Sequence, residues 1–352
     1  MRLLVAITPH GYGHAAQVAV VLEALAARCP DLELHLHTDV PRAFLESRIP
    51  VAFELHPGSS DFGMRMHSAL HLDLEASARD YAGLHAQRDR ALSRLGALLA
   101  RVRPDRVLCD VPWLPLRAAA ERGIPALALC SLNWADIYDH YFSARPEAQE
   151  LLAAMRADYL SARCFLAPEP HMPMPWLDNL QTIGPLARIG RNRRTEIDAA
   201  FGTSGRQLLL VALGGVAGRL SVTDWPRRAD RVLLVPDEWG AVREDIIPLG
   251  RLGMPFIDVL ASSDALVGKL GYGTVAECAC NGVPMIHAPR DDWPEEPVLA
   301  GWLARVGRLA RIETADLEAG RIDAALAAVA GQRFEPVPAT GAAMAVARLL
   351  QG

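Results

Sequence analysis

A glycine-rich turn in the second half of the chain most constrains the fold. The sequence Val267-Gly-Lys-Leu-Gly-Tyr-Gly-Thr-Val-Ala-Glu277 follows a short apolar run and is followed by a second apolar run at 283–287. This order predicts a strand, a tight turn, a helix from about Thr274 and a second buried strand. These elements form one βαβ step, and such a step places its two strands in parallel.

The same turn has the features of a phosphate-binding loop. Glycines at 268, 271 and 273 leave room for a large anion, and the helix that follows offers unpaired N–H groups and the positive end of its dipole. Lys269 adds a positive charge, Thr274 a hydroxyl donor, and Glu277 a carboxylate that can accept hydrogen bonds from a ribose. The alternative is an ordinary turn whose glycines serve only the backbone. We favour a diphosphate and ribose site formed by Lys269, Gly271, Tyr272, Gly273, Thr274 and Glu277, with a second backbone approach at Gly214 and Gly215.

Apolar runs separated by amphipathic helices occupy both halves of the chain. The expected strands are 3–7, 32–37, 106–109, 125–129 and 164–167 in the first half, and 207–213, 231–235, 265–267 and 283–287 in the second. Runs that are apolar throughout indicate parallel strands covered on both faces. Because 352 residues exceed one ordinary core, we expect an α/β protein with two Rossmann-like, doubly wound domains facing a cleft. Its expected parts are a first domain at 1–168, a connection at 169–205, a second domain at 206–335 and a C-terminal helix at 336–352.

A second candidate site follows the first expected strand. The turn Thr8-Pro-His-Gly-Tyr-Gly-His14 lies at the carboxyl edge of the sheet, where parallel sheets bind ligands. A helix N-terminus disfavours imidazolium, so His14 would stay neutral, as a general base requires. Asp110 ends a strand at the same edge, and its carboxylate would fix the tautomer of His14 and stabilise the cation formed on proton uptake. The alternative is that His14 is a polar turn residue and Asp110 caps a helix.

Several motifs resemble a known superfamily. Gly271-Tyr-Gly-Thr-Val-Ala-Glu277 resembles the nucleotide-diphosphate signature of GT-B glycosyltransferases, such as MurG and the UDP-glycosyltransferases. Gly13-His14 resembles the turn that supplies their base, and Asp110 the aspartate that pairs with it. A similarity to the N-terminal, glycosyltransferase-like region of L-arabinokinases is carried by His10-Gly-Tyr-Gly-His-Ala15, Asn133-Trp-Ala-Asp-Ile-Tyr138, Gly268-Lys-Leu-Gly-Tyr-Gly-Thr274 and Arg290-Asp-Asp-Trp-Pro-Glu-Glu-Pro297.

The resemblance implies an inverting glycosyltransferase of the GT-B fold. The first domain would bind a small-molecule or lipid-linked acceptor, the second a nucleoside-diphosphate sugar of the UDP type, and the C-terminal helix would cross back onto the first domain. His14 would be the base, paired with Asp110. The residues implied at the donor sugar are Glu295, Glu296 and Asp292. Tyr12, Asn133 and Trp134 are candidates to line the acceptor from their place at strand ends, and packing of Trp134 in the core stays open as the alternative. Lys269 stands where many UDP-glycosyltransferases have histidine, and Glu296 where glutamine is common.

We expect neither a metal nor a cofactor. No two aspartates are separated by a single residue, so the DxD clamp of another glycosyltransferase class is missing, and Lys269 with the helix dipole can neutralise a leaving diphosphate. Two other functions stay open. One is a non-catalytic sugar-nucleotide-binding or regulatory module, which needs neither His14 nor Asp110. The other is a sugar-nucleotide hydrolase or 2-epimerase on the same fold.

Composition limits the binding partners and the cellular compartment that we expect for this protein. The formal net charge of -5 argues against a nucleic-acid-binding surface. The six cysteines show no CxxC spacing, which favours free thiols in a reducing compartment. We find neither a secretory signal nor a long apolar window, so we expect a cytoplasmic protein whose membrane contact, if any, is peripheral. The base, the sugar, the acceptor and the oligomeric state stay open.

Overall fold

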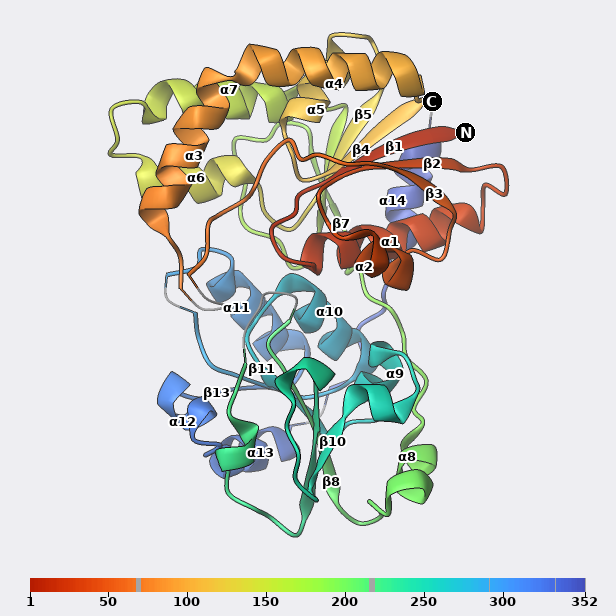
Figure 1. The fold of residues 1–352 in the computed structure, drawn as a ribbon, viewed down its shortest axis with the longest axis vertical. Helices are drawn as coiled ribbons and strands as arrows, with labels where there is room; N and C mark the ends of the chain where they lie inside the picture. The colour runs from red at the N-terminus through yellow and green to blue at the C-terminus, as the bar shows by residue number, and fades with distance from the viewer. Residues whose placement is uncertain (68–70, 215–218, 291, 333, 352) are drawn as a thin grey trace. The chain divides into compact units, whose positions relative to one another are not determined.

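The chain folds into two compact units (Figure 1). The structure is a computed structural model, and it describes residues 1–67, 71–214, 219–290, 292–332 and 334–351. Within these, the first unit holds Met1–His67, His71–Leu186 and the C-terminal segment from Thr340, whereas the second holds Ala187–Ala339. Each unit is built around one parallel sheet.

The first unit contains a seven-stranded sheet in the order β3-β2-β1-β4-β5-β6-β7. Every strand pairs in parallel with its neighbours. In β1, residues 3–7 are at most 1% exposed, as expected for a strand covered on both faces. The strands are β1 (Arg2–Ile7), β2 (Glu33–His37), β3 (Phe53–His56), β4 (Arg106–Asp110), β5 (Ala126–Leu129), β6 (Cys164–Pro168) and β7 (Leu180–Ile183).

Helices cover this sheet, and one of them comes from the end of the chain. The helix α14 (Gly341–Leu350) packs against α1 and β7, and Figure 1 shows it in blue beside α1. Its Ala345, Val346 and Leu349 are 0% exposed, so its apolar face belongs to the core of the first unit. The other helices are α1 (Gly13–Ala26), α2 (Arg42–Arg48), α3 (Leu74–Ala86), α4 (Arg88–Val102), α5 (Leu114–Ala120), α6 (Trp134–Phe142) and α7 (Ala148–Leu160).

The second unit contains a six-stranded parallel sheet in the order β10-β9-β8-β11-β12-β13. Its core joins the sheet to the tryptophans at 225 and 239. The strands are β8 (Gln207–Ala212), β9 (Arg231–Val235), β10 (Ile246–Pro248), β11 (Ala265–Gly268), β12 (Met285–His287) and β13 (Leu309–Arg311). The helices are α8 (Arg194–Phe201), α9 (Phe256–Ala261), α10 (Tyr272–Asn281), α11 (Glu296–Val306), α12 (Thr314–Glu318) and α13 (Asp323–Ala330), with 3-10 turns at Val222–Asp224, Asp237–Trp239 and Leu249–Leu252.

Two parallel sheets with flanking helices confirm the expected fold class. The segment 169–205, expected as a connection, contains two regular elements. Its β7 adds an edge strand to the first sheet, and α8 belongs to the second unit. The division between the units falls inside this segment, after Leu186. No helix in the described part of the chain combines the length and apolar composition needed to cross a membrane.

Candidate functional site

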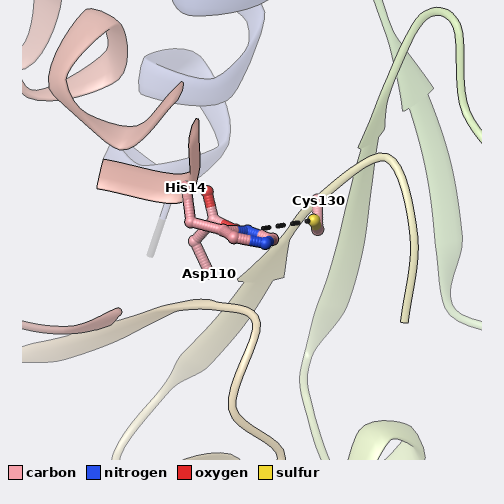
Figure 2. Close-up of side chains that lie close together, drawn as sticks. All are labelled: His14, Asp110 and Cys130. Atoms are coloured by element: carbon pink, nitrogen blue, oxygen red, sulfur yellow. Dashed lines mark hydrogen bonds and ion pairs between the residues drawn. The ribbon is translucent and has the colours of Figure 1, made fainter. Parts of the chain in front are cut away.

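His14 and Asp110 meet at the carboxyl edge of the first sheet. His14 lies in the first turn of α1, and Asp110 is the last residue of β4. The register pairs Ile7 with Asp110, and the N–H of Thr8 donates to the carbonyl of Asp110 at 2.8 Å, so the two site-bearing segments leave the sheet side by side. His14 Nδ1 lies 2.8 Å from Asp110 Oδ1 (Figure 2). The side chains are 11% and 0% exposed, respectively.

The contact expected between these two residues is therefore present. An ionised carboxylate only accepts hydrogen bonds, so the ring proton of His14 lies on Nδ1 and the lone pair on Nε2. This tautomer can take a proton at Nε2, and the buried Asp110 would stabilise the resulting imidazolium. The geometry is that of a general base with its orienting carboxylate, and the catalytic role itself stays a prediction.

Cys130 is a third member that the sequence did not reveal. It follows β5, the strand next to β4, and its Sγ lies 3.7 Å from His14 Nδ1 (Figure 2). One ligand atom from each of His14, Asp110 and Cys130 fits within 4.8 Å, close enough for one metal ion. In the sequence, the one feature that could have pointed to Cys130 is its position at the carboxyl end of the strand next to that of Asp110. The hydrogen bond between His14 and Asp110 accounts for their contact without an ion, and metal independence stays a prediction.

Aromatic rings pack beside His14. The Trp134 ring lies 5.8 Å from the His14 ring and 5.2 Å from the His10 ring. Trp134 is 0% exposed, and its backbone N–H donates to the hydroxyl of Tyr159 at 3.1 Å. Tyr12, 37% exposed, stacks on Phe44 at 4.2 Å. Trp134 therefore lies beside the catalytic candidates, whereas Tyr12 lies at the surface.

Asn133 has a structural task that the acceptor-lining prediction did not include. It is 0% exposed and caps α6: its Oδ1 accepts from the N–H of Asp136 at 2.8 Å, and its Nδ2 donates to the carboxylate of Asp136 at 2.7 Å. Such a cap satisfies an otherwise unpaired helix N–H. Both polar atoms of the Asn133 side chain are thus engaged in holding α6. A contact of Asn133 with the acceptor stays a prediction.

A second buried carboxyl, Asp61, belongs to the same region. The loop after β3 is held against the His14 turn, because Met64 N–H lies 3.2 Å from His10 Nδ1 and a Cβ at Gly63 would lie 2.5 Å from His10 Cβ. Asp61 is 6% exposed, and burial raises its pKa to about 7 even though the Thr8 hydroxyl, the Trp134 indole and a protonated His14 favour the ionised form. Within the described residues, neither the Thr8 hydroxyl nor the Trp134 indole N–H reaches hydrogen-bond geometry with Asp61 Oδ2. The sequence showed only a polar loop here, because burial of a loop carboxyl is a tertiary property.

In the second unit, the glycine-rich turn has the expected strand–turn–helix form. The helix α10 begins at Tyr272, two residues earlier than expected, with Gly271 in an extended conformation before it. A Cβ at Gly271 or Gly273 would meet no atom within 4 Å, so both glycines leave open space at the helix N-terminus. Gly268 is different: its Cβ would lie 2.0 Å from the carbonyl oxygen of Ala212, so glycine is needed there for sheet packing and not for a ligand. The helix end can still receive an anion at Gly271 and Gly273.

Lys269 is the cation of this turn. A Cβ at Gly214 would lie 4.0 Å from Lys269 Nζ, so the ammonium reaches the turn after β8. Burial lowers the pKa of Lys269 to about 7, with Arg290 acting in the same direction and Glu295 and Glu296 opposing it. An anion bound beside it would favour the charged form. Gly214 thus lies beside Lys269, whereas Gly215 lies outside the described residues.

The predicted sugar-binding glutamates are buried, and each has a partner. Glu295 and Glu296 are 5% and 7% exposed. The indole N–H of Trp293 donates to Glu295 at 3.2 Å, and the backbone N–H of Arg290 donates to Glu296 at 3.0 Å. The Arg290 guanidinium lies over the Trp293 ring at 4.7 Å, and the sequence did not suggest that role for Arg290. Asp292 stands in the left-handed region beside them, with φ of 47°.

Comparisons with known proteins place this geometry in context. No protein-family model matches the chain. Among curated proteins, L-arabinokinase of Arabidopsis thaliana is 26% identical over 310 residues, which are 84% of this chain and 29% of that protein. The chain thus spans less than a third of that relative's length.

Solved structures of glycosyltransferases are similar along nearly the whole chain. The glycotransferase of kitacinnamycin is 20% identical with a TM-score of 0.63, and the match covers 94% of this chain and 91% of the other. The spinosyn rhamnosyltransferase SpnG is 16% identical with a TM-score of 0.59, covering 99% and 94%. UGT89C1 of Arabidopsis thaliana complexed with UDP is 15% identical with a TM-score of 0.57, and the match covers 99% of this chain and 93% of the other. The chain has the GT-B fold. The resemblances drawn from its motifs, to GT-B glycosyltransferases and to L-arabinokinase, are confirmed.

Proposed function

We propose that this protein is an inverting, metal-independent glycosyltransferase that moves a sugar from a nucleoside-diphosphate sugar to an acceptor hydroxyl. The observation that carries the proposal is the contact of 2.8 Å between His14 and the buried Asp110 at the sheet edge of a GT-B fold. A module that only binds sugar nucleotides has no need for a neutral imidazole oriented by a buried carboxylate.

In the proposed reaction, the acceptor hydroxyl gives its proton to His14 Nε2 while its oxygen attacks the anomeric carbon of the donor. The bond between that carbon and the diphosphate oxygen breaks, and the nucleoside diphosphate leaves with the electron pair. Asp110 stays ionised and stabilises the imidazolium formed at His14. One displacement on the face opposite the leaving group inverts the anomeric configuration.

The second unit supplies the donor site in this proposal. The N-terminus of α10, the open space at Gly271 and Gly273, and Lys269 suit the diphosphate, and positive charge there stabilises the leaving group without a metal. Glu277 would receive the ribose, and Glu295 with Glu296 the sugar. Similar structures were solved as complexes with UDP, with UDP-L-rhamnose and with DTDP, so nucleotides of the UDP or dTDP type are the first donors to test.

A thermal-shift panel of nucleoside diphosphates and their sugars tests the donor half of the proposal. A ligand that binds only the folded state raises the unfolding temperature according to its affinity. We expect a specific rise with one family of nucleotides, reduced in Lys269→Met. No rise with any of the UDP, GDP, ADP or dTDP conjugates would contradict the proposal.

The acceptor half is tested by nucleotide release in the presence of hydroxyl-bearing small molecules and lipid-linked acceptors. Acceptor-dependent release with a glycosylated product supports transfer. Release without any acceptor would indicate a hydrolase or 2-epimerase. Binding with no turnover would indicate a regulatory module, an alternative favoured by the match to a limited part of L-arabinokinase.

A further inference from the structure

Two histidines and a glutamate meet on one face of the first sheet, in a cluster separate from the His14 site. His35 lies on β2, and Glu54 and His56 lie on β3. The parallel register pairs His35 with Glu54, and residues two apart on a strand project to the same face. The cluster therefore follows directly from the pairing of these two strands.

The ligand atoms of this cluster lie close enough together for one metal ion to reach all three. His35 Nδ1 lies 3.0 Å from His56 Nε2 and 3.4 Å from Glu54 Oε2, and His56 Nε2 lies 3.8 Å from Glu54 Oε1. Ligands about 2.0–2.2 Å from a tetrahedral zinc ion are about 3.4 Å apart. One atom from each of the three residues fits within 4.8 Å.

A second carboxylate fixes the orientation of His35. Glu33 Oε1 lies 3.3 Å from His35 Nε2, and the other oxygen of Glu33 is held by Arg2 at 2.8 Å. A carboxylate only accepts, so the proton of a neutral His35 lies on Nε2, and its Nδ1 lone pair faces Glu54. That nitrogen lies 3.0 Å from His56 Nε2 and 3.4 Å from Glu54 Oε2, so without an ion it accepts a hydrogen bond from His56, and an ion that displaces this proton can bind all three groups. A carboxylate on the outer nitrogen is also the usual neighbour of a metal-bound histidine.

Both imidazoles of the cluster are buried, whereas the side formed by Glu54 is open to solvent. The His35 and His56 side chains are 7% and 8% exposed, whereas Glu54 is 65% exposed. A neutral imidazole is the form that binds a metal. An ion can enter past Glu54, and water can complete its coordination.

We propose that His35, Glu54 and His56 bind a divalent transition-metal ion, with zinc as the ion that suits two imidazoles and a carboxylate. The ion would join β3, the edge strand of the sheet, to β2. It would thereby hold the loop after β3, which carries Asp61 and contacts His10. This site is structural and does not depend on the proposed sugar transfer.

The test is zinc binding by the full-length protein after treatment with a chelator. Isothermal titration should show one equivalent bound at this site, with a rise of roughly 5 °C in unfolding temperature at 100-fold excess over the dissociation constant. His35→Gln and His56→Gln should each weaken binding by at least about 100-fold, and Glu33→Gln by about 10-fold to 100-fold. A cobalt-loaded sample should show the intense visible absorption of a four-coordinate ion.

Two matched variants make the test specific. His37→Gln changes another histidine on β2, which bonds to the carbonyl of His56 and to Ser60, and should leave zinc affinity unchanged. His14→Ala should also leave it unchanged, which excludes the group of His14, Asp110 and Cys130 as the binding site. Circular dichroism confirms that each variant is folded. The proposal is overturned if zinc does not bind, if His56→Gln binds it normally, or if NMR shows a metal-free imidazolium at His35 donating to His56 in zinc-saturated protein.

Discussion

Replacing Asp61 by Asn should remove a pH-dependent loss of stability. Burial raises the pKa of Asp61 from 3.8 to about 7, so between these values the folded state holds a proton that the unfolded state has lost. Stability therefore falls as pH rises through this window, at about 1.4 kcal/mol per pH unit. The full loss is about 4 kcal/mol, of which about 2.5 kcal/mol falls between pH 5 and pH 8.

The assay is urea unfolding of wild type and Asp61→Asn at pH 5 and pH 8. Asn cannot ionise, so the free energy of unfolding of Asp61→Asn minus that of wild type should be about 2.5 kcal/mol higher at pH 8 than at pH 5. Any pH-independent effect of the amide cancels in this comparison. Asp89→Asn, a change of an exposed carboxylate on α4, controls for the loss of one charge. Parallel stability profiles for wild type and Asp61→Asn would refute the assignment of a protonated, buried carboxyl beside His14.

Three further predictions concern the two candidate sites. Because burial lowers the pKa of Lys269 to about 7, diphosphate binding at pH 8 should take up as much as one proton, and affinity should fall as pH rises above 7. Titration calorimetry in buffers of different ionisation enthalpy measures the proton uptake. If no proton is taken up, Lys269 does not contact the diphosphate. Gly273→Ala should keep or slightly raise the unfolding temperature while weakening nucleotide binding. Gly268→Ala should lower the unfolding temperature, because the added Cβ would meet the carbonyl oxygen of Ala212. Equal effects of the two substitutions on the unfolding temperature would show that Gly268 is not needed for packing. Asp110→Asn should lower turnover by about 100-fold or more with donor affinity retained, and a variant with wild-type turnover would show that the His14 tautomer needs no carboxylate.

The fold class could be predicted because its signal is local. Apolar runs such as 3–7 and 265–267 are apolar throughout, and strands of that kind are stable only when covered on both faces. The edge strand β7 was missed because Leu180-Gln-Thr-Ile183 has only one fully buried residue. Its pairing with β6 decides its structure, and that pairing is not visible in a four-residue segment.

The site could be predicted where residues follow strand ends, and not where tertiary contacts define them. Asp110 ends one strand and His14 follows a neighbouring strand at the same sheet edge, so parallel topology alone brings them close. Asp61 reaches the same region through a loop whose course depends on contacts with His10. For Gly268 the sequence suggested a role that the structure does not support. Its place in a glycine-rich motif predicted space for a ligand, but glycine is needed there because a Cβ would meet the carbonyl oxygen of Ala212 on the neighbouring strand.

The central claim is that His14 removes the acceptor proton, and the most direct measurement compares turnover with donor affinity in His14→Ala. Turnover is followed as nucleotide release with the identified acceptor, and affinity by calorimetry with the donor. We predict that turnover falls by at least about 100-fold, whereas the donor dissociation constant changes by less than about 2-fold. Equal losses of turnover and donor affinity, or turnover that persists without the imidazole, would contradict the account.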